Sequence, residues 1–334
     1  MFYPTFLTLA AFIVSLIGTR LLIQRLRGSA VFSDVPNERS SHHVPTPKGG
    51  GIAVVTTIFI YFVAMDHINY VLLLVLLLLA GISLLDDLVH INPLARLMSH
   101  FIAVSVMLTV SDFNIVSGVF PAWLDMVILA IGWVWFINLF NFMDGIDGIS
   151  ASEACSICGG IALILAFSEL FEDGLAYQAM IVFGAVAGFW WWNRHPAKIF
   201  LGDVGSVPLG FLLGYLLLDF ASAGFIAATV ILPAYYIMDA TVTLLRRIIE
   251  RKPPMQAHRE HFYQQAASQV GHHGIIVQLV TGLNLLLIAF AHFSVVNPEL
   301  YWLYIVLAYA VSGIWCLTFM RLSKHLKRLE RSRK

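Results

Sequence analysis

Apolar runs long enough to cross a bilayer fill most of this chain, and they constrain its fold more than any other feature. About 20 apolar residues span the hydrocarbon core of a membrane as a helix. The composition agrees, because 59% of the residues are hydrophobic and 12% are charged, outside the usual balance of a soluble domain. We therefore expect an all-α, polytopic transmembrane helical bundle in a single domain covering 1–334. About eleven runs qualify, at roughly 3–24, 48–64, 70–85, 97–110, 119–141, 151–168, 175–192, 207–221, 224–245, 275–293 and 300–320.

Charge segregation orients these runs. If successive runs alternate across the bilayer, the loops before the second, fourth, eighth and tenth runs share one side with the C-terminal tail. All 20 Lys and Arg residues fall on that side, whereas the opposite loops carry acidic residues and no basic ones. The positive-inside rule then predicts that this side is cytoplasmic, with the N-terminus on the opposite side of the membrane and the C-terminus in the cytoplasm. The first run lacks a preceding basic segment, so we expect a retained helix. Zero net charge and the absence of a basic block argue against nucleic acid as a partner.

Acidic residues stand at the ends of several runs, on the side predicted to be cytoplasmic. Asp86 and Asp87 end the third run, Asp144 and Asp147 follow the fifth, and Asp203 precedes the eighth. Carboxylates at a membrane boundary are costly unless they are paired or bind a cation. Glycines beside three of them allow sharp turns and close approach of a ligand. This placement predicts a Mg²⁺ and phosphate site at the membrane surface, with the substrate phosphates completing the coordination.

Basic and aromatic residues in the same loops supply groups for an anionic ligand. Lys48, followed by three glycines, suits an anion held by a cation and backbone amides, and it suits a helix anchor equally well. His258, Arg259 and His261 gather groups that suit a diphosphate. Pro233 lies inside the ninth run and should kink that helix.

Four blocks of residues, in this order, resemble a known family. The blocks are Pro36-Asn37 with Pro45-Thr-Pro-Lys-Gly-Gly50, Asp86-Asp87, Asn141-Phe-Met-Asp-Gly-Ile-Asp-Gly148, and Asn193 with Phe200-Leu-Gly-Asp-Val-Gly-Ser206. Together they are similar to the polyprenyl-phosphate N-acetylhexosamine-1-phosphate transferases, the family of the phospho-N-acetylmuramoyl-pentapeptide translocase and the enterobacterial undecaprenyl-phosphate GlcNAc-1-phosphate transferase. The resemblance covers about 34–264. The forms Arg-Ser-Ser-His in the first block and His-Arg-Glu-His-Phe-Tyr-Gln near its end resemble most closely the branch that initiates O-antigen synthesis.

The resemblance implies an enzyme. Its reaction would move a sugar 1-phosphate from a UDP-N-acetylhexosamine to undecaprenyl phosphate and release UMP, with Mg²⁺ as cofactor and Mn²⁺ as an alternative. This would be the first membrane step of O-antigen, lipopolysaccharide or other surface-glycan synthesis, with the active site facing the cytoplasm. GlcNAc and the 6-deoxy sugars FucNAc and QuiNAc are all open as the transferred sugar. Membrane lipid is a further expected partner, and a homodimer is left open.

The resemblance also implies roles for the acidic residues. Asp203 matches the family's metal aspartate, and Asp144 and Asp147 match positions beside the metal and the nucleotide. Asp86 and Asp87 match a pair that orients or deprotonates the lipid phosphate.

Nucleotide and diphosphate positions are implied in the same way. Asn141 and Asn193 match polar residues beside the nucleotide, and Phe200 matches a ring that stacks on the uracil base. His258, Arg259 and His261 fall where the family has a histidine cluster near the diphosphate, with His261 as a catalytic candidate. The chain departs from the family here, because Phe262 and Tyr263 replace a fuller run of histidines.

Two other classes compete with this interpretation. A secondary transporter could use the same acids to couple ions, but transporter sites usually lie near the bilayer midplane on broken helices. Here the acids gather at helix ends. A CDP-alcohol phosphotransferase lacks support because its spaced aspartate signature is missing. Release of UMP from a UDP-sugar would separate the enzyme from a carrier.

Overall fold

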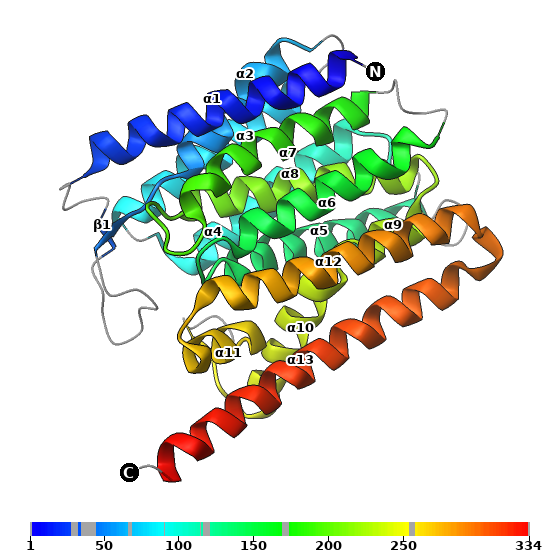
Figure 1. Cartoon of the computed structure of the whole chain (residues 1–334). Coiled ribbons are helices and arrows are strands. Elements are labelled where there is room, and N and C mark those ends of the chain that lie inside the picture. The colour runs from blue at the N-terminus through cyan, green and yellow to red at the C-terminus, as the bar shows by residue number, and fades with distance from the viewer. Residues whose placement is uncertain are drawn as a thin grey trace.

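The computed structural model describes residues 2–27, 33–34, 45–65, 69–89, 91–113, 115, 121–168, 174–253 and 258–332. Helices run through most of this part of the chain, and the N-terminal and C-terminal ends lie at opposite ends of the bundle (Figure 1). The helices are α1 (Phe2–Leu26), α2 (Gly51–Val63), α3 (Tyr70–Val89), α4 (Pro93–Val110), α5 (Ala122–Met143), α6 (Ile149–Ala166), α7 (Gly174–Asn193), α8 (Asp203–Ser222), α9 (Ile226–Ile231), α10 (Ala234–Ile249), α11 (Phe262–Val270), α12 (His273–Val296) and α13 (Tyr301–Ser332), with the 3-10 turn η1 (Pro298–Leu300). Two short strands, β1 (Ser33–Asp34) and β2 (Thr46–Pro47), pair antiparallel.

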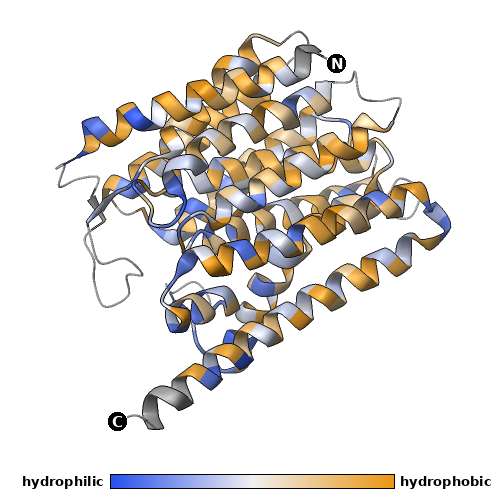
Figure 2. Cartoon of the chain, viewed as in Figure 1, coloured by the Kyte–Doolittle hydropathy of each residue, from blue (hydrophilic) through white to orange (hydrophobic). Residues whose placement is uncertain are grey.

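The prediction of an all-α, polytopic membrane bundle is confirmed. Nine helices of the described chain are long and apolar enough to cross a membrane. Figure 2 shows that hydrophobic residues predominate along these helices. Two further expected ranges are occupied by α2, which has 13 residues, and by the pair α9 and α10. Eleven crossings therefore remain a prediction.

Proline divides the ninth expected run into two helices. The helix α9 ends at Ile231 and α10 begins at Ala234, with Pro233 in the N-cap position. Proline lacks a backbone N–H and its ring clashes with the preceding turn, so a helix cannot continue through it undisturbed. The predicted kink at Pro233 is confirmed, and it takes the form of a break.

Helix α8 occupies the centre of the bundle and is buried along almost its whole length. Small residues allow its neighbours to approach closely, as is common between helices in membranes. A Cβ atom on Gly51 would overlap the backbone of Gly205, so α2 crosses α8 at a glycine–glycine contact. Farther along α8, Gly210 lies against Ile137 of α5. This packing fixes the N-terminus of α8 relative to the ends of its neighbours.

Glycines with positive φ start the two helices that carry the predicted site. Gly148 (φ 81°) precedes α6, and Gly202 (φ 74°) precedes α8. Residues with a Cβ atom rarely adopt this conformation, which explains why glycine stands beside the acids at both turns.

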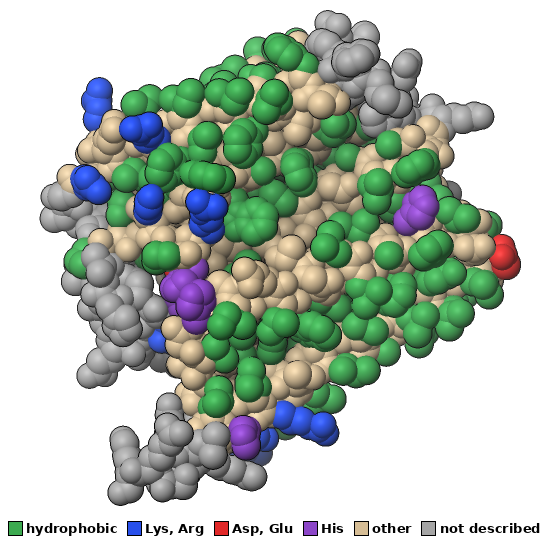
Figure 3. Space-filling view, in the orientation of Figure 1, with side chains coloured by type: hydrophobic (Ala, Val, Ile, Leu, Met, Phe, Trp, Pro, Cys, Tyr) green, Lys and Arg blue, Asp and Glu red, His purple; other side chains and the backbone are tan. Residues whose placement is uncertain are grey.

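The charged side chains visible on one face agree with the predicted segregation. On the face shown in Figure 3, Lys and Arg side chains gather at one end of the helices, and an acidic side chain marks the other end. Which of the two ends faces the cytoplasm stays a prediction.

Candidate functional site

The N-terminus of α8 holds the centre of the predicted site. Asp203 is the first residue of this helix, and its side chain is 32% exposed, so a ligand can reach it. Asn141, near the end of α5, donates a hydrogen bond from Nδ2 to Oδ1 of Asp203 over 3.0 Å. The same amide nitrogen lies 2.8 Å from Oγ of Ser206, one turn along α8. Asn141 thus ties the end of α5 to the start of α8 and orients the Asp203 carboxylate.

Arg96 links two of the predicted acids. Its Nη1 lies 2.6 Å from Oδ2 of Asp86 and 3.4 Å from Oδ2 of Asp203. The other oxygen of Asp86 accepts a hydrogen bond from the backbone N–H of Ile91 at 2.6 Å. Asp86 is buried, with 8% of its side chain exposed, and both of its oxygens are occupied by these contacts. Asp86 thus ties the end of α3 to Arg96, and its predicted catalytic role stays a prediction.

Asp87 turns toward the same helix end. Its Oδ2 accepts a hydrogen bond from the N–H of Val204 at 3.3 Å, in the first turn of α8. The amides at a helix N-terminus favour a negative charge, and the carboxylate lies where they point. The positive charge of Lys48 is also close enough to Asp87 to interact with it. Asp87, Lys48 and Asp203 are thus brought together from three distant segments.

Asp144 completes a group of three neighbouring carboxylates. It caps the C-terminus of α5 and is half-buried. Burial raises the pKa of Asp144 to about 7, the charges of Asp203 and Asp87 act in the same direction, and a hydrogen bond with Ser150 opposes them. The negative charges of the three acids therefore act on one another, and a cation bound among them would relieve this repulsion.

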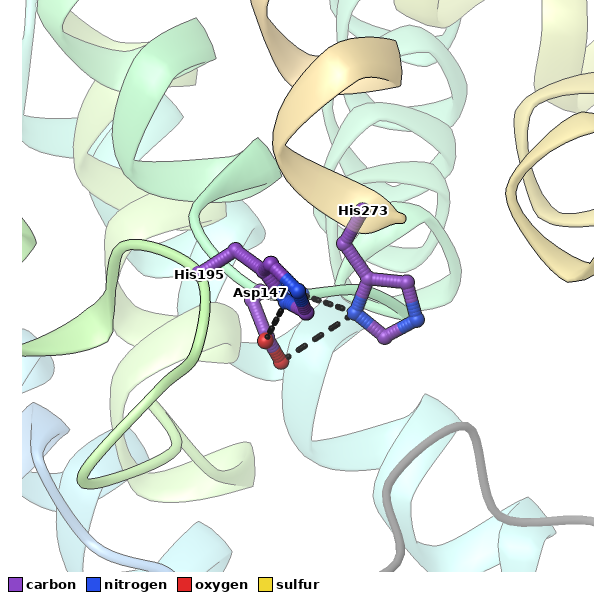
Figure 4. A group of neighbouring side chains, drawn as sticks. All are labelled: Asp147, His195 and His273. Carbon is purple, nitrogen blue, oxygen red and sulfur yellow. Dashed lines mark hydrogen bonds and ion pairs between the residues drawn. The ribbon is translucent and has the colours of Figure 1, made fainter. Parts of the chain in front are cut away.

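Asp147 belongs to a second, separate cluster (Figure 4). Its Oδ2 lies 2.7 Å from Nδ1 of His195 and accepts a hydrogen bond from the N–H of Ala197 at 3.1 Å. Its Oδ1 lies 3.4 Å from Nδ1 of His273. Burial alone would raise the pKa of Asp147, but these contacts outweigh it and hold the pKa below its usual value. A role for Asp147 beside a metal shared with Asp203 stays a prediction.

Asn193 and Phe200 shape the loop that leads into α8. The amide of Asn193 accepts a hydrogen bond from the N–H of Gly148 at 2.9 Å and donates one to the carbonyl oxygen of Ile199 at 2.9 Å. Asn193 thereby fixes the turn before α6. Phe200 forms a parallel β-bridge with Lys48 and presents a half-buried ring. The predicted contacts of Asn193 and Phe200 with a nucleotide remain untested.

The histidine loop is anchored by Asp239, an acid outside the predicted site. Asp239 of α10 is fully buried and accepts hydrogen bonds from the N–H groups of Phe262 (3.1 Å) and Tyr263 (3.2 Å) at the start of α11. Nδ1 of His261 lies 3.2 Å from the same carboxylate. The hydroxyl of Tyr263 donates to the carbonyl oxygen of Met143 at 2.8 Å, next to Asp144. Asp239 therefore positions the start of α11 against the end of α5.

The loop residues differ in how far they can meet a ligand. His261 is 1% exposed, which fits a positioning role more directly than contact with substrate. His258 is half-buried, and burial together with the charges of His261 and Arg247 lowers its pKa to about 4. His258 is thus an uncharged imidazole at neutral pH. Arg259 is half-buried and provides a cation in the same loop.

Arg96 and Asp239 could have been found from the sequence. The expected fourth run began at residue 97, whereas α4 begins at Pro93, which places Arg96 in its first turn. Asn92 caps that helix by accepting a hydrogen bond from the N–H of Leu94, and Asn followed by Pro is a recognisable helix start. Asp239 is an acid inside an apolar run, which itself indicates a buried partner.

Comparison with known proteins places this arrangement among sugar-phosphate transferases. Residues 68–221 match the profile of glycosyl transferase family 4. The chain is 30% identical over 254 residues to a phospho-N-acetylmuramoyl-pentapeptide-transferase of Frankia alni, covering 60% of this chain and 72% of that protein. It is 28% identical over 255 residues to an undecaprenyl-phosphate alpha-N-acetylglucosaminyl 1-phosphate transferase of Thermotoga maritima, covering 75% of this chain and 78% of that protein. The chain is 26% identical over 294 residues to a phospho-N-acetylmuramoyl-pentapeptide-transferase of Borreliella afzelii. The alignment covers 75% of this chain and 83% of that protein.

Proposed function

The chain belongs to glycosyl transferase family 4, the polyprenyl-phosphate sugar-1-phosphate transferases, and from this premise we propose that it transfers an N-acetylhexosamine 1-phosphate from a UDP-sugar to undecaprenyl phosphate. The sugar would be GlcNAc or a 6-deoxy relative such as FucNAc or QuiNAc, and UMP would leave. The reaction would start O-antigen or another surface glycan at the cytoplasmic face of the bacterial inner membrane. One observation carries this proposal: Asp87, Asp144 and Asp203 converge at the N-terminus of α8.

The residues at that point fit a magnesium ion. The three carboxylates offer oxygen ligands, which Mg²⁺ prefers, and their charges repel one another without a cation. Asp203 and Asp144 would hold the ion, with Asp87 beside them at the first turn of α8. When bound, the cation would neutralise charge that develops on the transferring phosphoryl group.

The chain's own residues supply the other parts of the reaction. Arg96, beside Asp203, and Lys48, near Asp87, are cations that can hold the donor diphosphate and the lipid phosphate. Asp87 would orient the lipid phosphate or accept its remaining proton. An oxygen of that phosphate then attacks the phosphorus linked to the sugar, a new P–O bond forms, and the bond to UMP breaks.

Turnover by substituted proteins tests the proposal. With purified protein, UDP-GlcNAc and undecaprenyl phosphate, Asp203→Asn should lower UMP release by about 10²–10³-fold, the scale of losing one charge-stabilising group. Asp219→Asn, near the other end of α8, is the matched control and should keep nearly full turnover. Near-normal release by Asp203→Asn with Mg²⁺ present would remove Asp203 from the reaction. A carrier would release no UMP, and a panel of UDP-sugars with mass analysis of the lipid product would identify the sugar.

A further inference from the structure

The cluster of Asp147, His195 and His273 is built from three separate segments. Asp147 lies in the turn before α6, His195 in the turn after α7, and His273 is the first residue of α12. One ligand atom from each lies within 4.8 Å of the other two. Figure 4 shows both imidazole rings directed at the carboxylate from different sides. Side chains 48 and 126 residues away from Asp147 thus meet at a single point.

The donor atoms of this cluster differ from those of the three-carboxylate group. Two imidazole nitrogens and one carboxylate oxygen form a donor set typical of zinc and similar transition-metal ions, whereas Mg²⁺ prefers oxygen ligands alone. The side chains of Asp147 and His273 are 7% and 8% exposed, and His195 is 24% exposed. The cluster is therefore shielded from water but open on the His195 side.

The two separations that involve Asp147 suit a metal ion after a small adjustment. Ligands bound at 2.0–2.2 Å to a tetrahedral ion lie about 3.3–3.6 Å apart. The separation of 3.4 Å between Nδ1 of His273 and Oδ1 of Asp147 already has this value. The separation of 2.7 Å between Nδ1 of His195 and Oδ2 of Asp147 is that of a hydrogen bond. It would have to open by roughly 0.6 Å, which a rotation of the partly exposed His195 ring can supply.

Other contacts prepare the carboxylate for a cation. The N–H of Ala197 donates to Oδ2 of Asp147 and fixes the direction of the carboxylate, as outer hydrogen bonds commonly do around metal ligands. Arg194, next to His195, stacks over the ring of Trp191 at 3.9 Å. The backbone N–H of Asp147 points at Nδ1 of His273 over 3.5 Å. The backbone N–H and the carboxylate of Asp147 thus both hold the His273 ring at the cluster.

We propose that Asp147, His195 and His273 bind a transition-metal dication of the zinc class. A hydrogen bond joins only one nitrogen to one oxygen of this cluster. A single dication can bind all three ligand atoms at once. The bound ion would tie the turn that carries Asp144 to the loop before α8 and to the start of α12. This site goes beyond the proposed transferase reaction and does not depend on it.

Cobalt binding tests the site directly. The full chain, purified in detergent without a polyhistidine tag and stripped with a chelator, is titrated with Co²⁺ and followed by visible ligand-field absorption. We expect one equivalent to bind and Zn²⁺ to displace it. His273→Asn and His195→Asn should each weaken binding by about 100-fold or more, since loss of an outer partner alone costs 10–100-fold. The control His292→Asn, on the same α12, should bind as the wild type does.

Two further measurements keep the outcomes distinct. Zn²⁺ should raise the thermal-unfolding midpoint of the wild type and leave that of His195→Asn unchanged, with both proteins shown to be folded without metal. Asp203→Asn should keep the cobalt spectrum even though it loses turnover, which separates this site from the proposed magnesium site. The proposal is overturned if the wild type binds no stoichiometric Co²⁺ or Zn²⁺. It is equally overturned if binding persists undiminished in both histidine variants.

Discussion

Replacing Arg96 with alanine should reduce both stability and turnover, because one guanidinium serves two carboxylates. Its contact with Asp86 is a charge-assisted hydrogen bond of 2.6 Å to a side chain that is 8% exposed. Loss of such a partner from a buried carboxylate costs about 2–3 kcal/mol. The contact of 3.4 Å with Asp203, which is 32% exposed, adds at most about 1 kcal/mol because water screens it. The free energy of unfolding should therefore fall by roughly 2–4 kcal/mol.

Turnover by Arg96→Ala should fall together with its stability. Arg96 holds the Asp203 side chain in place and provides a cation at the site. We expect UMP release by Arg96→Ala to drop about 100-fold, and Arg96→Lys to recover part of the loss, because lysine keeps the charge without the planar geometry. The assay pairs the thermal-unfolding midpoint with kcat/KM for UMP release.

A double-substitution cycle separates the two contacts of Arg96. The variant that carries both Arg96→Ala and Asp86→Asn should lose less free energy of unfolding than the two single losses added together, by about 1–2 kcal/mol. The neutral amide introduced at position 86 needs no cation beside it. Strictly additive losses, or an Arg96→Ala protein with wild-type midpoint and turnover, would refute the reasoning.

The remaining predictions concern other acids of the site. Asp87→Asn should lower turnover strongly with little change in midpoint, whereas Asp86→Asn should mainly lower the midpoint; equal, mild losses would argue against a base in this pair. Because the pKa of Asp144 is raised to about 7, its charged form is lost as pH falls, so kcat/KM should drop about tenfold per unit below pH 7. Added Mg²⁺ competes with the proton and should move this decline to lower pH, and a decline that ignores Mg²⁺ would exclude Asp144 as a ligand. Asp239→Ala should speed amide hydrogen exchange in α11 by about 10-fold or more, since its first two N–H groups lose their acceptor; unchanged exchange would remove Asp239 as the anchor.

The sequence predicted the helices well because run length and hydropathy decide where a chain can cross a membrane. The boundaries failed where polar residues continue a helix. The third apolar run was expected at 70–85 with Asp86 and Asp87 at its end, and α3 continues two residues beyond them, through Val89. The helix can continue through these acids because Arg96 and the start of α8 accommodate their charges. Neither partner is visible in the run itself.

The site was predictable in its members and less so in its grouping. Glycines and acids at two helix starts indicated correctly that Asp203 and Asp144 approach each other. The partners of Asp147 were not predictable, because His195 and His273 come from loops that local patterns do not connect. Their meeting depends on how α7 and α12 pack around α6, which only the folded chain specifies.

Release of UMP by a set of aspartate variants tests the central claim most directly. The claim is that Asp87, Asp144 and Asp203 act as one site at the start of α8. Groups that act as a unit give strongly non-additive losses. In the presence of Mg²⁺, UDP-GlcNAc and undecaprenyl phosphate, the triple Asn variant should therefore be about as slow as Asp203→Asn alone, and release by the wild type should require the lipid phosphate. Losses that multiply across the three positions, or near-wild-type UMP release by the triple variant, would contradict the account.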